Sequence, residues 1–185
     1  MSGQLVILSG PSGVGKDTVL SAWVSEDPRV ERVVAYTTRQ PRVGEVDGLD
    51  YHFIDEVSFT ARAERGAFLE WMRVHDFGYA TPLDDMDELL EQGKIAVLKI
   101  DVQGALRVMD LRREVLSIFL LPPSWEALEA RIRGRGMDTE ERILRRLEGA
   151  RNELEVAPKY QHRVVNDDVA GAVAEIRAIV AGANH

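Results

Sequence analysis

Short apolar runs alternate with stretches of helical period along most of the chain. Leu5–Leu8, Ile95–Ile100 and Leu116–Leu120 are apolar nearly throughout, as expected of strands buried on both faces of a sheet. Weaker strand signals stand near Val33–Tyr36, Tyr51–Phe53 and Val164–Val165. Because apolar strands recur between helices, the pattern predicts an α/β fold with a parallel sheet flanked by helices, although it leaves the strand order open.

Helical periodicity fills most of the remaining chain. The expected helices are Lys16–Ser25, Glu56–Arg65, Leu83–Gln92, Gly104–Arg112, a segment beginning at Trp125, Thr139–Val156 and Val169–Val180. Gly66 and Gly93 stand where helix C-caps are expected, and Ser124 stands where an N-cap is expected. Residues 36–82 mix strand and helix signals and are expected to form an inserted lobe.

Composition limits the chemistry that the chain can carry. Its 185 residues, 45% of them hydrophobic and 29% charged, suit one globular core with short inserted lobes. The absence of cysteine excludes disulfides, thiolate metal sites and a cysteine nucleophile. The apolar runs are too short to span a membrane, and the first residues lack a signal-peptide pattern. A cytoplasmic protein with no membrane partner is therefore expected.

The charge balance argues against nucleic acid as a partner. The net charge is −8, whereas nucleic-acid surfaces carry an excess of Lys and Arg. Most basic residues are arginines, whose forked guanidinium suits bidentate phosphate binding. A codon bias would explain this count as well, so only the positions of individual arginines are informative.

Gly10–Lys16 fits the G-x-x-x-x-G-K part of the phosphate-loop pattern, between an expected strand and an expected helix. Glycines let backbone N–H groups turn toward phosphate oxygens, and the helix N-terminus faces the same anion. Lys16 adds positive charge for the terminal phosphates. The motif predicts a phosphate-loop NTPase type of core that binds a nucleoside triphosphate and transfers its terminal phosphoryl group. The expected contacts are Gly10, Pro11, Ser12, Gly13, Val14, Gly15, Lys16, Asp17 and Thr18.

Asp17 departs from the pattern, which asks for Ser or Thr after the lysine. A carboxylate donates no hydroxyl to phosphate, and its charge repels phosphate unless magnesium or water stands between them. Thr18 is one possible source of the missing oxygen. The alternative is a magnesium ion held mainly through water and substrate.

Asp101 directly follows the apolar run Ile95–Ile100, where an acidic residue on the magnesium side is expected. A plain helix cap is the alternative role for this residue. Lys99 shares the face of Asp101 on the expected strand, so it either pairs with Asp101 or touches a phosphate.

Residues 36–82 hold a second set of polar residues. Arg39 and Arg42 stand on either side of Pro41 and could place two guanidinium forks on one anion, with phenolic donors from Tyr51 and Tyr79. Glu70 could accept two N–H donors from a base edge, a pattern that guanine offers and adenine does not. The alternatives are a surface turn for the arginines and core packing for Trp71 and Phe53, and for these two aromatic residues core packing is expected.

Together these segments resemble the guanylate kinase family, over about Leu5 to Ile179. The residues that carry the resemblance are Gly10–Lys16, Thr37–Glu45, Asp50–Phe53, Glu70–Trp71, Ile100–Gly104, Gly134–Gly136 and Val165–Asp168. The resemblance implies transfer of the γ-phosphoryl group of ATP to GMP, and to dGMP as well, with magnesium. It also implies a guanylate kinase-like domain over 4–181, with a core (4–35, 83–130 and 150–181), a GMP-binding lobe (36–82) and a lid (131–149).

The resemblance assigns roles by matching position. Arg39, Arg42, Tyr51 and Tyr79 would hold the GMP phosphate, and Glu70 and Thr81 would read guanine. Asp101 would lie near GMP or magnesium, and Thr18 and Asp101 are weak candidates for a metal held mostly by ATP and water. Arg135 and Arg146 of the lid would close over ATP, with Arg131 as a weaker third, and Asn166 and Asp167 would lie beside adenine. The implied catalytic residues are Lys16, Arg39, Arg135 and Arg146.

Two departures from the family pattern accompany this assignment. Ala35 replaces a serine that commonly contacts guanine, which costs about 0.5–1.5 kcal/mol for one neutral hydrogen bond. Lys99 replaces a residue that is usually acidic, so it needs a partner or access to solvent.

Two other functions remain open from the sequence. One is a small kinase for a different acceptor, and the other is a non-catalytic guanylate kinase-like module that binds peptides. The expected assembly is a monomer or a small homo-oligomer.

Overall fold

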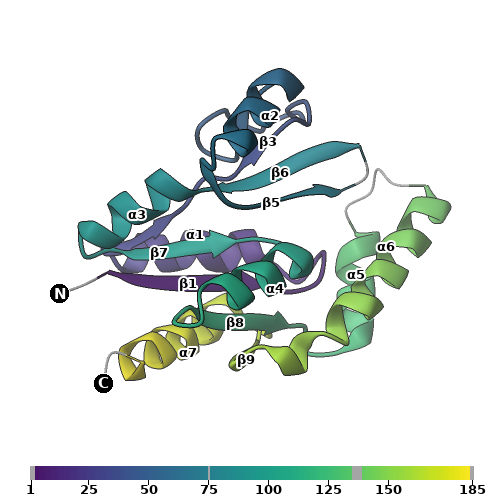
Figure 1. Cartoon of the computed structure of the whole chain (residues 1–185). Coiled ribbons are helices and arrows are strands. Elements are labelled where there is room, and N and C mark those ends of the chain that lie inside the picture. Colours follow the sequence, from purple (N-terminus) through teal and green to yellow (C-terminus); the bar gives the residue numbers. More distant parts are fainter. Residues whose placement is uncertain (1–2, 75, 135–138, 184–185) are drawn as a thin grey trace.

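The computed structural model describes residues 3–74, 76–134 and 139–183 (Figure 1). A five-stranded parallel sheet forms its centre, in the order β2-β7-β1-β8-β9. The strands are β1 (Gln4–Ser9), β2 (Val30–Arg32), β7 (Ile95–Lys99), β8 (Leu116–Leu121) and β9 (His162–Val165). This architecture confirms the predicted α/β fold with a parallel sheet.

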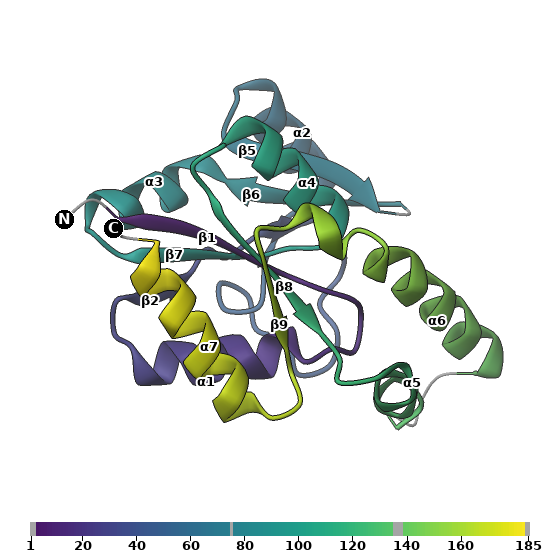
Figure 2. The same cartoon turned by 90° about the horizontal axis from the view of Figure 1, so that it is seen from below.

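Helices cover both faces of the central sheet (Figures 1 and 2). One face packs against α1 (Lys16–Glu26) and α7 (Val169–Gly182), which lie side by side, and the other packs against α3 (Leu83–Glu91) and α4 (Val102–Leu111). The side chains of β1 alternate between the two cores, with Val6 and Leu8 on the first face and Leu5 and Ile7 on the second. Because both faces are covered, the strand is apolar at every one of these positions.

A second sheet lies beside the first and is formed within residues 36–82. Its order is β4-β3-β6-β5, with β3 antiparallel to β6 and β6 antiparallel to β5. Its elements are β3 (Tyr36–Thr37), β4 (His52–Phe53), α2 (Glu56–Glu64), β5 (Phe68–Val74) and β6 (Phe77–Pro82). Phe59 of α2 is buried against Phe68, which gives this sheet a small core of its own.

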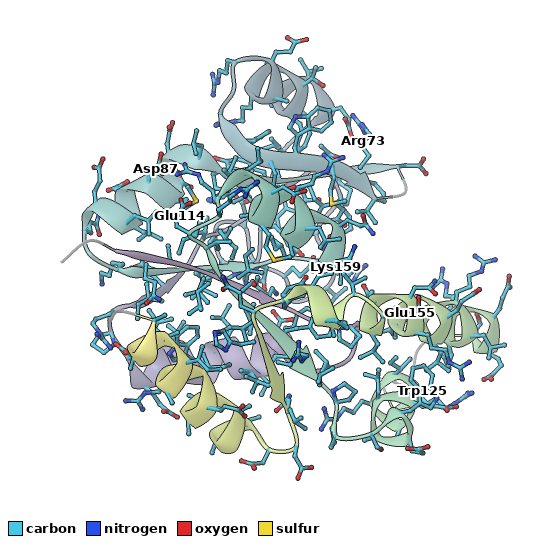
Figure 3. The ribbon with its side chains drawn as sticks, turned by 60° about the horizontal axis from the view of Figure 1, so that its bottom comes forward. Arg73, Asp87, Glu114, Trp125, Glu155 and Lys159 are labelled. Atoms are coloured by element: carbon cyan, nitrogen blue, oxygen red, sulfur yellow. The ribbon has the colours of Figure 1, made fainter. Side chains whose placement is uncertain are left out.

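Two further helices project from the carboxyl side of the central sheet, α5 (Trp125–Arg133) and α6 (Glu140–Leu154), followed by the short helix η1 (Ala157–Lys159). Ser124 caps α5 by accepting from Ala127 N, as predicted, and Thr139 caps α6 by accepting from Arg142 N. Trp125 of α5, labelled in Figure 3, lies under the guanidinium of Arg151 from α6 at 4.6 Å. This contact joins the two helices near their bases.

Most predicted elements are present within a few residues, but the region after β2 differs. The strand expected near Val33–Tyr36 is wrong, because the chain leaves the central sheet after Arg32 and enters the second sheet only at Tyr36. Val33 is apolar because it is buried in the core, and its N–H still bonds the carbonyl of Val97. The apolar residues after β2 therefore reflect burial in the core and do not indicate a strand.

The long hairpin of β5 and β6 was not predicted from the sequence. Its residues mix apolar and charged side chains, because one face packs on α2 and the other borders a pocket. Trp71 of β5 is 44% exposed, so the expectation that it packs in the core is wrong. Phe53 is half-buried. The C-caps are Arg65 and Gln92, and the predicted glycines Gly66 and Gly93 follow them directly with φ values of 72° and 74°, as is common where a helix ends.

No helix among the described residues is long and apolar enough to cross a membrane.

Candidate active site

The phosphate loop connects the end of β1 to the start of α1. Gly10, Gly13 and Gly15 have φ values of 148°, 86° and 98°, which L side chains rarely adopt. A Cβ on Gly10 would lie 2.6 Å from the carbonyl oxygen of Leu120, and one on Gly15 would lie 2.7 Å from Nδ2 of Asn166. The loop is therefore closely packed, and its glycines are required by conformation and by space.

Asn166 contacts the backbone of the phosphate loop through its side chain. Its side chain is buried, and Nδ2 donates to the carbonyl of Val14 at 2.7 Å. Arg131 of α5 donates to the same carbonyl at 3.3 Å and to the carbonyl of Asn166 at 3.1 Å. Asp167 follows on the surface. Asn166 thus touches the loop itself, a contact that the sequence did not indicate.

Helix α6 reaches the opposite side of the loop. Oε2 of Glu153 accepts from the backbone N–H of Ser12 at 3.0 Å, and Arg146 donates to the Ser12 hydroxyl at 3.3 Å. Burial raises the pKa of Glu153, although the Ser12 N–H and the charge of Lys16 oppose the shift. Glu153 is not among the site residues predicted from the sequence. Its spacing from Arg146, two helical turns, was the one available signal.

Lys16 lies within the loop and bonds the loop's own carbonyls. Its Nζ donates to Gly10 at 2.6 Å and to Pro11 at 3.1 Å. Burial lowers the pKa of Lys16, while the carboxylates of Glu153 and Asp17 oppose this shift. The loop therefore holds a desolvated positive charge at the start of α1. Thr18, in the same first turn, is exposed.

Lys99 contacts neither Asp101 nor the phosphate loop's backbone but the carboxylate of Asp17. Of the two roles expected for Lys99, pairing with Asp101 is therefore wrong, because its partner is Asp17. The two residues stand 82 positions apart in the chain, so only the parallel pairing of β1 with β7 brings them together.

A pocket lies between the second sheet and the carboxyl end of β7, and we name it the Glu70 pocket. Its walls come from β5 and β6 on one side and from Lys99 and the start of α4 on the other. Tyr51, Glu70, Tyr79, Thr81 and Asp101 all line it, as does Ala35. The fold thus brings together, from distant segments, most of the residues singled out as candidates for binding GMP.

Glu70 is the most unusual residue of this pocket, because it is an acidic residue that is only 8% exposed. Oε1 accepts from the Thr81 hydroxyl at 2.8 Å, whereas Oε2 is buried without a hydrogen-bond partner among the described residues. Burial raises the pKa of Glu70, the Thr81 bond opposes this, and the charge of Asp101 adds to it. A buried carboxylate oxygen without a donor is costly unless a ligand supplies one.

Asp101 caps a helix, which is one of the two roles that the sequence left open. Its Oδ1 accepts from Gly104 N at 2.9 Å and so caps α4. Its side chain also lines the Glu70 pocket. The cap fixes the position of a carboxylate at this wall of the pocket.

Arg39 lies beside the pocket and is held by Glu45. Its two terminal nitrogens bond Glu45 at 2.9 and 2.8 Å, and its guanidinium lies 5.5 Å from the Tyr51 ring centroid. The hydrogen bonds that Arg39 donates to Glu45 are the largest of several effects that raise the pKa of Arg39. Arg42 is exposed, and its backbone N–H also bonds Glu45. From the sequence, Glu45 stood out only as part of a motif, and its role in positioning Arg39 was not predicted.

Arg135, expected to close over ATP, lies outside the described residues. Among the described residues, no group of three or more His, Asp or Glu side chains could hold a metal ion. Magnesium takes one or two carboxylates together with substrate phosphates and water, and the carboxylate of Asp101 at the wall of the pocket fits such a site.

Comparison with known proteins gives a consistent result. Residues 2–183 match the family model described as guanylate kinase. A guanylate kinase of Caldanaerobacter subterraneus subsp. tengcongensis is 46% identical over 96% of this chain and 86% of its own length. One from Aromatoleum aromaticum is 43% identical over 97% of this chain and 88% of its own length.

Solved structures give the same fold. The crystal structure of guanylate kinase from Anaplasma phagocytophilum has a TM-score of 0.80 and 31% identity, covering 98% of this chain and 86% of that chain. The SH3-kinase fragment of tight junction protein 3, with a TM-score of 0.54 and 13% identity, shares the fold alone. The phosphate loop and the Glu70 pocket agree with these matches, and we conclude that the chain belongs to the guanylate kinase family.

Proposed function

We propose that this chain transfers the γ-phosphoryl group of ATP to GMP, giving ADP and GDP. Family membership supports this activity, and one observation supports the acceptor. The Glu70 carboxylate is buried in the pocket with Oε2 unpartnered among the described residues. Guanine presents adjacent N–H donors on its Watson–Crick edge, whereas adenine presents a ring nitrogen acceptor there. A buried carboxylate therefore favours guanine over adenine.

The pocket supports a nucleoside monophosphate as the acceptor because cationic and phenolic groups lie next to Glu70. Arg39, held by Glu45 and stacked near Tyr51, would bind the GMP phosphate together with Tyr51 and Tyr79. Arg42 would approach from the exposed turn. Thr81, already bonded to Glu70, would share in reading the base. The base edge and the phosphate are common to GMP and dGMP, so we propose both as acceptors.

The donor site would be built from the phosphate loop. Its backbone N–H groups and the N-terminus of α1 would bind the ATP phosphates, and Lys16 would move from its own loop carbonyls to the phosphates. Arg146, which already reaches Ser12, and Arg135 would add positive charge from the lid. Asn166 would hold the loop's shape while adenine lies beyond it, near Asp167.

Catalysis would rest on positioning and charge neutralisation. The acceptor oxygen already belongs to a phosphate anion at neutral pH, so the reaction needs no strong general base. Lys16 and the lid arginines would oppose the charge of ATP, and Arg39 and Arg42 would oppose that of GMP, so that the two anions can meet in line. Lys99 lines the proposed acceptor pocket and bonds the residue after Lys16, which supports donor and acceptor sites that lie next to each other.

We propose the same division of labour for the parts of the chain. Residues 36–82 form the GMP-binding lobe, residues 131–149 form the lid, and the rest of 4–181 forms the core. Closure of lobe and lid over the substrates would exclude water and suppress ATP hydrolysis.

We also propose magnesium as the metal that accompanies ATP. Bound there, it would neutralise phosphate charge and orient the phosphates. Thr18 and Asp101 are the side chains that would approach it, with water between. The net charge of −8 argues against nucleic acid as a partner. We propose small nucleotides as the partners, with no membrane partner. We further propose that the protein is a cytoplasmic monomer or small homo-oligomer.

An acceptor screen tests this proposal. ADP release from ATP is measured with GMP, dGMP, AMP, CMP or UMP. We expect kcat/KM for GMP to exceed that for AMP by about a hundredfold or more, because Glu70 leaves an adenine edge unsatisfied. ATP consumption that no nucleotide acceptor accelerates would refute the kinase function, and a preference for another base would refute the role of Glu70.

A further inference from the structure

Two charged side chains meet at the boundary between the phosphate loop and the Glu70 pocket. Asp17 stands in the first turn of α1, directly after Lys16, where the phosphate-loop pattern places a hydroxyl. Lys99 is the last residue of β7 and lines the Glu70 pocket. Its Nζ donates to the Asp17 carboxylate. One ion pair therefore joins the first turn behind the loop to the wall of the pocket.

The carboxylate of Asp17 opposes the binding of a triphosphate. The N-terminal turn of α1 is the part of the loop region that attracts anions, through its unpaired N–H groups and dipole. Asp17 adds a fixed negative charge to that turn, next to Lys16, and like charges at this range repel. Without a counter-charge, Asp17 would weaken the attraction that the loop and Lys16 provide.

Lys99 supplies that counter-charge. Its side chain is only 12% exposed, whereas that of Asp17 is 76% exposed, so Lys99 is enclosed where it meets the carboxylate. Burial raises the pKa of Asp17, but the hydrogen bond and charge of Lys99, and then the charge of Arg32, outweigh it and keep the pKa below its usual value. The two side chains are thus in direct contact as an ion pair.

We propose that Asp17 and Lys99 act as one unit, in which Lys99 cancels the negative charge that Asp17 places beside the phosphate loop. Lys99 is then a positioning residue for donor binding and not a ligand of either nucleotide. ATP binding depends on Lys99 only while Asp17 is present. This inference rests on the proposed ATP site.

A double-mutant cycle measures the dependence directly. The dissociation constant for ATP is determined by calorimetry for the parent, Lys99→Met, Asp17→Ser and the double variant, with magnesium and with a chelator. Lys99→Met is expected to weaken ATP binding by about tenfold, since Asp17 is partly screened by solvent. The double variant is expected to bind within about threefold of the parent, because the charge that needed neutralising is gone.

Two controls separate charge from structure. Lys94→Met removes a lysine just before the opposite end of the same strand and is expected to leave ATP binding unchanged. Lys99→Arg keeps the charge and is expected to retain most of the affinity. The loss in Lys99→Met should also shrink at high salt, which a packing defect would not do.

Two results of the double-mutant cycle would contradict the proposed role of Lys99. A double variant as weak as Lys99→Met would show that Lys99 binds phosphate itself, and unchanged binding in Lys99→Met would show that Asp17 needs no partner; either result overturns the inference. Should Lys99→Met fold poorly, Asp17→Ser still decides, because a loss beyond about threefold contradicts the proposed cost of Asp17. Absence of ATP binding in the parent would refute the proposed function instead.

Discussion

At the scale of single residues, the site is defined by side chains whose charges are held in unusual surroundings. Glu70 is a nearly buried carboxylate with one oxygen bonded and one without a partner among the described residues. Lys16 is a desolvated lysine that bonds carbonyls. Such arrangements cost stability in the free protein and are typical of binding sites, where a ligand completes them.

Glu70→Gln should therefore raise the stability of the free protein and weaken its binding of GMP. The folded-state pKa of Glu70 is raised, so its contribution to stability is fully present below the unfolded-state pKa and is lost as pH rises through the folded value. At pH 8 the variant should gain about 2–4 °C in Tm, equivalent to about 1 kcal/mol for a chain of this length. The gain should vanish at pH 4, and KM for GMP should rise about tenfold or more.

Thermal unfolding at pH 4, 6 and 8, together with GMP kinetics, checks this prediction. Glu64→Gln removes the same charge from an exposed position at the end of α2 and serves as the control. A variant that is less stable than the parent at pH 8 would show that Glu70 is not strained in the free protein.

At the scale of elements, the phosphate loop is a short segment whose shape is fixed by its neighbours. Its glycines supply the backbone conformation, but Asn166 after β9, Arg131 of α5 and Glu153 of α6 hold it in place. Three elements from the second half of the chain therefore determine how well the loop presents its N–H groups.

Asn166→Ala tests this support. The substitution removes the 2.7 Å bond to the Val14 carbonyl and leaves that acceptor dependent on Arg131. We expect a loss of about 1–3 kcal/mol in unfolding free energy and weaker ATP binding, with KM for GMP little changed. Denaturant unfolding and calorimetry measure these effects. Asp167→Ala, one residue later and exposed, is the matched control for stability. Unchanged ATP affinity in Asn166→Ala would show that the loop keeps its shape unaided.

At the scale of the whole molecule, the parallel sheet sets the geometry between the phosphate loop and the Glu70 pocket. The carboxyl ends of β1 and β7 lie side by side, so the loop after β1 and the pocket wall after β7 become neighbours. Ligands of open parallel sheets bind at this edge. The sheet can hold these ends in register because helices cover both of its faces.

The packing of the covering helices should matter for stability without entering the chemistry. Trp23 of α1 is fully buried in the core shared with α7, whereas Trp71 of β5 is 44% exposed. Trp23→Ala is expected to cost about 3–5 kcal/mol of unfolding free energy, and Trp71→Ala under about 1 kcal/mol. Denaturant unfolding of the two variants compares them directly. Similar losses would contradict the different burial of the two side chains.

Much of this organisation was predictable because it is local. The phosphate loop is seven consecutive residues whose glycines and lysine act where they stand, and the buried strands are runs whose neighbours in sequence share one environment. Helix ends were predictable for the same reason, because capping depends on residues within one turn. Ser124 begins a helix, and Gly66 and Gly93 directly follow two others. The resemblance to a family then supplied candidate residues at matching positions.

The rest was decided only by tertiary structure. Lys99 meets Asp17 across 82 residues, Glu153 meets Ser12 across 141, and Asn166 meets Val14 across 152. Each pairing depends on which strands become neighbours, and strand order carries no local signal in the sequence. The sequence alone therefore determined which chemical groups the protein has and which kind of fold bears them. The tertiary structure decided which charges neutralise one another, because electrostatic energy depends on distance in space and not on separation along the chain.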